Sequence, residues 1–124
     1  MIEVQNVSKS FTLHQHGSTV ISVLEDGNLR VAPGECVALT GVSGSGKSTL
    51  MRMIYGNYLT QAGSIRVGEV EVVGAEPREI LALRRKTLGY VSQFLRVVPR
   101  VPTIDVVAEP LLAIGTSEDA ARAR

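Results

Sequence analysis

The sequence has little cysteine, little net charge and no long apolar run, and each absence excludes a class of protein. Its 124 residues include one cysteine, Cys36, so no disulfide can form within the chain. This sparing use of cysteine is typical of a reducing compartment, and we expect a cytoplasmic protein. The apolar runs are only a few residues long, far short of the roughly 20 that a membrane-spanning helix needs. We therefore expect membrane contact only through a partner.

The charge balance also disfavours a nucleic-acid partner. Thirteen Lys and Arg residues oppose twelve Asp and Glu residues, which leaves a formal net charge of +1. Bulk electrostatics therefore gives no case for binding a nucleic acid. Both histidines, His14 and His16, lie in one polar segment that resembles a hairpin tip. Two histidines without a nearby third ligand favour a solvated loop over a metal site.

The most informative feature is the segment 41–49, which reads GVSGSGKST. It fits G-x-x-x-x-G-K-[ST], a loop whose backbone N–H groups surround nucleotide phosphates. A buried strand is expected before it and a helix after it, so the helix dipole adds positive potential. That context disfavours the alternative of a flexible Gly/Ser linker. The expected nucleotide-binding residues here are Gly41, Ser43, Gly44, Ser45, Gly46, Lys47, Ser48 and Thr49.

Two of these side chains have defined roles in such a loop. Lys47 is expected to reach the β- and γ-phosphates, and the Ser48 hydroxyl is expected to ligate Mg²⁺. The glycines allow the backbone to approach the phosphates and to adopt positive φ. The pattern therefore predicts a site for ATP and Mg²⁺.

Hydrophobic periodicity and turn residues predict alternating strands and helices. Cys36 is expected to be a small buried hydrophobe in the strand before the phosphate loop. Thr103 is an expected N-cap, and Pro110 is expected to bend or interrupt the helix that follows it. The cationic cluster 84–86 is expected to be solvated and to complement a helix dipole rather than to bind phosphate. The predicted strands are 2–7 (an edge strand), 20–24, 29–31 (after a turn at 26–28), 35–40, 64–67, 70–73 and 87–92, and the predicted helices are 50–58, 77–86, 104–114 and one starting at 117.

Three features together give the chain a family resemblance. They are the phosphate loop, Gln93 at the end of a predicted strand, and the aromatic Phe11 after the first strand. With these features the chain resembles the N-terminal half of an ATP-binding-cassette (ABC) nucleotide-binding domain. The resemblance implies that Phe11 stacks on adenine. It also implies that Gln93 contacts Mg²⁺ and the attacking water, and couples the site to a helical subdomain.

The resemblance implies an α/β fold of the P-loop NTPase class, ABC ATPase type, with an N-terminal antiparallel β-subdomain. We expect residues 1–34 to form the antiparallel region, 35–93 the core from phosphate loop to glutamine, and 94–124 the start of the helical subdomain. The chain stops inside its last predicted helix. We therefore expect a partial domain whose C-terminal half is absent.

Several elements of the ABC pattern do not occur in these 124 residues. There is no Leu-Ser-Gly-Gly-Gln-type signature, no apolar strand ending in Asp-Glu, and no histidine placed to act as the switch histidine. Family members of full length hydrolyse ATP. Because phosphoryl transfer depends on positioning metal and water, a chain without these groups is expected to hold phosphate but to hydrolyse it poorly or not at all.

The segment 90–100, YVSQFLRVVPR, suggests a finer assignment. It resembles the L subunit of the phosphonate carbon–phosphorus lyase system, which implies a second ABC-type subunit and other lyase-system subunits as partners. The insert between Phe11 and Leu24 also resembles the ATP-binding subunits of lipoprotein-release and macrolide exporters. That alternative implies a membrane permease as partner. A third interpretation is a nucleotide-binding assembly subunit with little ATP turnover. A non-ABC kinase or GTPase is disfavoured, because the sequence contains neither Asp-x-x-Gly nor Asn-Lys-x-Asp.

Overall fold

The computed structural model describes residues 1–13, 18–91 and 99–123. The expected histidine loop and Gln93 lie outside the described residues. The chain divides into two compact units, Met1–Ile80 and Leu81–Arg124, which are described in turn.

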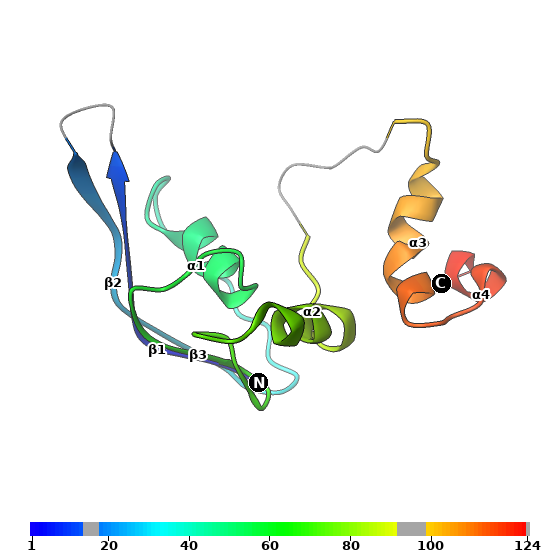
Figure 1. Ribbon diagram of the computed structural model, residues 1–124, viewed down its shortest axis with the longest axis horizontal. Helices are drawn as coiled ribbons and strands as arrows, with labels where there is room; N and C mark the ends of the chain where they lie inside the picture. Colours follow the sequence, from blue (N-terminus) through cyan, green and yellow to red (C-terminus); the bar gives the residue numbers. More distant parts are fainter. Residues whose placement is uncertain (14–17, 92–98, 124) are drawn as a thin grey trace. The chain divides into compact units, whose positions relative to one another are not determined.

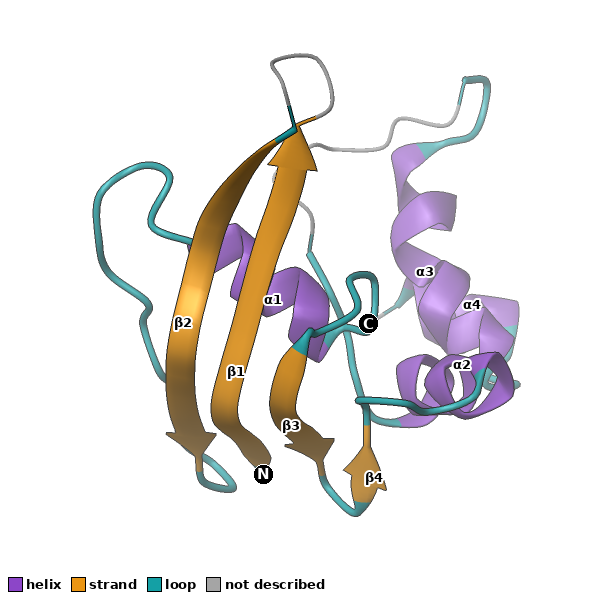
Figure 2. Cartoon of the chain, turned by 60° about the vertical axis from the view of Figure 1, so that its left-hand side comes forward, coloured by secondary structure: helices purple, strands orange, loops and turns teal. Residues whose placement is uncertain are grey.

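The first unit is built on a four-stranded antiparallel sheet in the order β2-β1-β3-β4 (Figure 2). Its strands are β1 (Ile2–Leu13), β2 (Thr19–Val31), β3 (Ala62–Val67) and β4 (Val70–Glu71). The antiparallel β-subdomain implied by the resemblance is confirmed, and it includes β3 and β4 from beyond residue 34. The edge position expected for the first strand is wrong, because β1 pairs with β2 on one side and with β3 on the other.

β2 is one continuous strand, although two strands separated by a turn were expected. The turn residues instead form an irregularity in the β1–β2 ladder, where Asn6 and Asp26 have φ of 50° and 46°. The Asn28 side chain bridges it: Oδ1 accepts the Asn6 N–H at 3.0 Å, and Nδ2 donates to the Asp26 carbonyl at 2.7 Å. Because the local hydrogen bonds are satisfied there, pairing continues beyond the kink.

Helix α1 (Lys47–Ile54) packs against the sheet and forms the core of this unit (Figure 1). Met53 on the helix, Ile65 on β3 and Val7 on β1 are completely buried. The helix was expected to run to about Tyr58 but ends at Ile54, because Gly56 with φ of 75° turns the chain. Leu50 and Ile54 complete the buried face that its periodicity predicts.

The short hairpin of β3 and β4 is held by one carboxylate. Glu71 accepts hydrogen bonds from the Ser64 hydroxyl and from the N–H groups of Ile65 and Val73. Partial burial raises the pKa of this carboxyl, but these hydrogen bonds and the nearby Arg66 charge outweigh it and lower the pKa overall. The strand predicted over 70–73 is therefore shorter, because β4 ends at Glu71. Beyond it, the Glu71 side chain accepts the Val73 N–H.

The predicted strand 35–40 is not part of the sheet, and most of it is exposed. Cys36 is exposed as well, so its expected burial is wrong. The physical reason is that no strand among the described residues pairs with this segment, whereas a central strand is buried and ordered by pairing on both sides. Residues 87–91 of the predicted strand 87–92 likewise form no strand.

Helix α2 (Pro77–Lys86) begins in the first unit and ends in the second. Its start at Pro77 and its basic last turn at 84–86 agree with the sequence prediction. The carboxylate of Glu79 accepts the backbone N–H of Glu76 at 2.8 Å, which satisfies a donor that the helix start leaves free.

The second unit also contains α3 (Thr103–Ala113) and α4 (Glu118–Arg122), which pack against each other (Figure 1). Thr103 is the first helical residue rather than the N-cap, and Pro110 lies inside α3 without ending it. Arg122 lies 2.7 Å from the Asp105 carboxylate and 2.9 Å from that of Glu118, so one guanidinium joins both helices.

Candidate functional site

The phosphate-loop segment turns sharply into α1 through Gly46. This residue has φ of 84° and is the N-cap of the helix. A Cβ at this position would lie 2.6 Å from the Val23 carbonyl oxygen on β2, so only glycine fits. The first helical hydrogen bond runs from the Leu50 N–H to the Gly46 carbonyl at 2.8 Å. The N–H groups of residues 47–49 precede that bond and form the positive end of the helix dipole.

The Lys47 ammonium lies inside the loop that precedes it. It donates to the carbonyls of Gly41 at 2.8 Å and Val42 at 2.7 Å, and to the Ser45 hydroxyl at 3.1 Å. These three acceptors hold the loop curved around a single positive charge. A cation held beside a helix N-terminus is the arrangement that polyphosphate recognition requires.

The remaining loop residues shape the turn and the start of the helix. Gly44 also has positive φ, and the Ser45 N–H donates to the Val42 carbonyl at 3.3 Å, which tightens the turn. Ser48 is exposed in the first helical turn, and Thr49 beside it is half-buried. An exposed hydroxyl next to the phosphate position is chemically suited to ligating Mg²⁺. The donors and the glycine-lined backbone thus fit both ATP phosphates and a magnesium ion.

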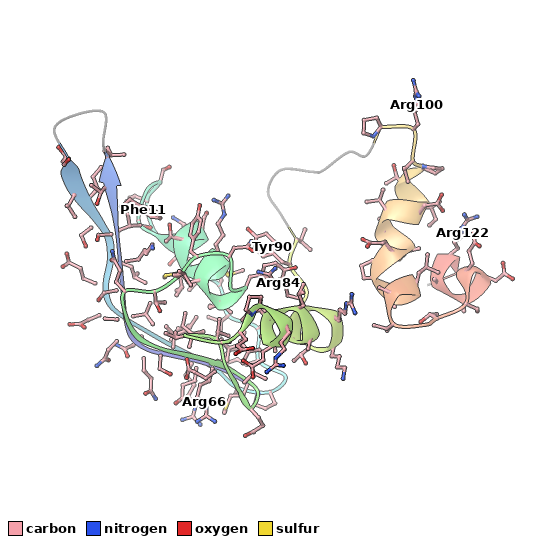
Figure 3. All side chains as sticks on the ribbon, in the orientation of Figure 1. Phe11, Arg66, Arg84, Tyr90, Arg100 and Arg122 are labelled. Carbon is pink, nitrogen blue, oxygen red and sulfur yellow. The ribbon has the colours of Figure 1, made fainter. Side chains whose placement is uncertain are left out.

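Phe11 lies on β1 (Figure 3). It pairs with Ile21 of β2, two residues along that strand from Val23, whose carbonyl oxygen lies against Gly46 of the loop. Its half-buried ring packs edge-on against Tyr58, with centroids 5.7 Å apart and planes at 74°. The Lys9 ammonium lies over the ring, 5.2 Å from its centroid. The structure therefore brings Phe11 and the phosphate loop to the same stretch of β2.

The segment after α1 is tied to β1 by side-chain hydrogen bonds that the sequence analysis did not predict. Lys9 Nζ donates to the Leu59 carbonyl at 2.8 Å. The Gln61 side-chain oxygen accepts from the Ser10 N–H at 2.7 Å and from its hydroxyl at 3.0 Å. One signal was present in the sequence, because Lys9 and Phe11 are two residues apart and share a face of an extended strand.

Gln93, the expected second ligand of Mg²⁺, lies outside the described residues. Over the described ranges, no group of three or more His, Cys, Asp or Glu residues is arranged to hold a metal ion. In the same ranges, no helix is both long and apolar enough to cross a bilayer.

The fold and the loop define a P-loop nucleotide-binding protein of the ABC ATPase class. Two solved structures of the ATP-binding cassette MJ0796 superimpose on the chain with TM-scores of 0.87, at 27% and 28% sequence identity. Each match covers 99% of this chain and 53% of that protein. One of them is a dimeric, post-hydrolysis state bound to ADP and phosphate. The expected ABC ATPase fold is confirmed.

The profile of the ABC transporter family matches residues 24–123, so the chain belongs to that family. It is 38% identical to the lipoprotein-releasing system ATP-binding protein LolD of Bordetella pertussis, over 90% of this chain and 48% of that protein. It is 36% identical to the macrolide export ATP-binding/permease protein MacB of Sodalis glossinidius, over 89% of this chain and 16% of that protein. The ABC transporter ATP-binding protein YtrE of Bacillus subtilis is 35% identical over 93% of this chain and 50% of its own length.

The chain thus spans about half the length of LolD and YtrE, and a smaller share of MacB. The resemblance to an ABC nucleotide-binding domain is confirmed. The finer resemblance to the carbon–phosphorus lyase L subunit gains no support from these comparisons. They favour the lipoprotein-release and macrolide-exporter alternative instead.

Proposed function

We propose that this chain binds MgATP as part of the ATP-binding subunit of an ABC transporter. The observation that supports this most directly is the Lys47 ammonium, held by three loop acceptors within 3.1 Å at the N-terminus of α1. Phosphate oxygens entering the loop meet this charge and the free N–H groups of the first helical turn. The Phe11 ring lies beside the part of β2 that contacts the loop, and we propose that it stacks on the adenine.

The proposed Mg²⁺ site uses the Ser48 hydroxyl as one ligand. The ion supplies charge neutralisation between the phosphate oxygens when it is bound. Gln93 is proposed as a second contact to Mg²⁺ and to the attacking water, and this role rests on the family resemblance alone. The chain's own contribution at the described site is to bind and orient the nucleotide.

We infer the partners from the functions that the names of the relatives state. LolD, MacB and YtrE are ATP-binding proteins of transport systems, and MacB is also a permease. A membrane permease and a second ABC-type subunit are therefore the proposed partners, with the chain on the cytoplasmic side. The dimeric form of the MJ0796 cassette supports the second of these.

Isothermal titration with MgATP tests nucleotide binding. The wild-type protein is expected to bind, and Lys47→Ala is expected to lose binding because the loop loses its central cation. Lys86→Ala removes an equivalent charge from the exposed C-terminal end of α2 and is expected to bind normally. Retention of micromolar binding by Lys47→Ala would overturn the phosphate-loop assignment.

A separate experiment tests the transport role against phosphonate breakdown. A tagged copy of the natural protein, purified from detergent-solubilised cells of its host, is expected to retain a multi-span permease. Co-purification with soluble phosphonate-degrading subunits and without a permease would refute transport. That outcome would favour the carbon–phosphorus lyase reading suggested by residues 90–100.

A further inference from the structure

The part of β1 that carries Phe11 lies where the sheet has only two strands. Pairing between β1 and β3 ends at Ser8, whereas pairing with β2 continues to Leu13. A two-stranded ribbon is marginally stable by itself and twists easily. The Phe11 ring therefore needs support from outside the sheet if it is to keep a fixed position.

That support comes from the segment that follows α1. The Tyr58 ring contacts the Phe11 ring edge-on, and the Tyr58 hydroxyl accepts a hydrogen bond of 2.8 Å from Arg52 Nη1. The Arg52 guanidinium also lies 5.5 Å from the centroid of the Tyr58 ring. Arg52 belongs to α1, the helix that begins at Lys47. One continuous series of contacts thus joins Phe11 to the phosphate-loop helix.

We propose that Tyr58, held by Arg52, is a positioning residue that fixes the Phe11 ring at a set distance from the phosphate loop. This inference rests on the proposed function, because it concerns the nucleobase of the bound nucleotide. A purine nucleoside triphosphate touches the site at two places, the ring and the loop. Affinity for the whole molecule requires their separation to match the length of the nucleotide.

The geometry gives Tyr58 a role that differs from general packing. Met53 and Ile54 form the buried core under α1, whereas Tyr58 and Phe11 are only half-buried. Removal of the Tyr58 ring therefore releases Phe11 without opening the core. An edge-to-face pair changes an equilibrium constant by about two- to tenfold. Stacking of a base on an aromatic ring changes it by about fivefold to a hundredfold.

The test compares two ligands, MgATP and magnesium tripolyphosphate, by isothermal titration on the same proteins. Tripolyphosphate occupies the phosphate loop but has no base to stack. Tyr58→Ala is expected to weaken MgATP binding about five- to tenfold and to leave tripolyphosphate within about twofold. Tyr58→Phe keeps the edge contact but loses the Arg52 hydrogen bond, so a loss of about two- to threefold for MgATP is expected. Leu59→Ala, at an exposed neighbouring side chain, is the matched control and is expected to match wild type.

The outcomes separate this inference from the proposed function. A selective loss of MgATP affinity in Tyr58→Ala, partly restored in Tyr58→Phe, supports the positioning role. Equal loss of both ligands would make Tyr58 merely structural, and unchanged affinity for both would also overturn the inference, while nucleotide binding by the wild type stands. A wild-type protein that binds neither ligand would refute the proposed function and this inference with it.

Discussion

Replacing Gly46 by alanine tests how the phosphate loop is held against the sheet, and Gly44 provides a matched control. Both residues have φ of 84°, a conformation that costs an L-residue about 1–2 kcal/mol. A Cβ on Gly44 meets no heavy atom within 4 Å. Gly44→Ala is therefore expected to lower the free energy of unfolding by about 1–2 kcal/mol.

Gly46→Ala carries the same backbone cost and a steric one. Its Cβ would lie 2.6 Å from the Val23 carbonyl oxygen, well inside the 3.4 Å at which ordinary contact begins. The obstacle is backbone, so either β2 or the start of α1 must shift. Forced shifts of this kind cost about 1–3 kcal/mol. The expected total is about 2–5 kcal/mol, which exceeds the Gly44→Ala effect by about 1–3 kcal/mol.

The assay is urea unfolding followed by far-ultraviolet circular dichroism, with MgATP affinity measured on the same samples. Gly46→Ala is expected to lose nucleotide binding as well, because the N–H groups of the first helical turn move with the loop. Equal losses of stability for the two variants would refute the reasoning, since the backbone angle alone would then explain both. Normal MgATP binding by Gly46→Ala would show that the loop tolerates the shift.

Three smaller predictions concern hydrogen bonds that hold the scaffold. Asn28→Ala is expected to cost about 1 kcal/mol in urea unfolding, because water only partly replaces the exposed hydrogen bonds to the Asn6 N–H and the Asp26 carbonyl; an unchanged midpoint would contradict this. Glu71→Gln is expected to cost about 1 kcal/mol at pH 7 after solvent screening. Because the folded pKa of Glu71 is lowered, its stabilisation is fully present above the ordinary pKa of 4.5 and disappears as the pH falls through the folded pKa, so wild type and variant should converge in acid. Arg122→Ala is expected to cost at most about 1 kcal/mol, and the loss should shrink in high salt because the Asp105 pair is partly exposed; a salt-independent loss would argue against an ionic origin.

Features governed by neighbouring residues could be predicted from the sequence. Helix α2 begins at Pro77 and ends in a basic turn as predicted, because proline at a first turn and cations at a last turn act locally. The glycines and Lys47 of the phosphate loop form a strict spacing pattern, which predicts a helix directly after the loop. Helix α1 follows the loop, but it begins at Lys47 and ends at Ile54 instead of spanning 50–58. The proposed stacking role of Phe11 depends on the family resemblance, because a single aromatic residue forms no spacing pattern.

Features that depend on distant segments could not be predicted in this way. The interior position of β1 depends on pairing with β3, and nothing near residues 2–7 encodes it. The segment 35–40 has the composition of a buried strand, yet Cys36 is exposed and no strand forms. A strand of that kind is ordered by neighbours on both sides, and composition alone supplies none.

The difference between local and long-range contacts also divides the candidate site into two parts. The phosphate half of the site is local: Lys47, the loop carbonyls and the first turn of α1 follow one another in sequence. The proposed nucleobase half is not local, because Phe11 on β1 contacts Tyr58 beyond α1. Loss of the Tyr58 contact leaves the hydrogen bonds of Lys47 in place, whereas it removes a support from the two-stranded end of β1 and β2. Phosphate binding should therefore tolerate loss of this contact better than recognition of the base, and the ratio of the two affinities measures that difference directly.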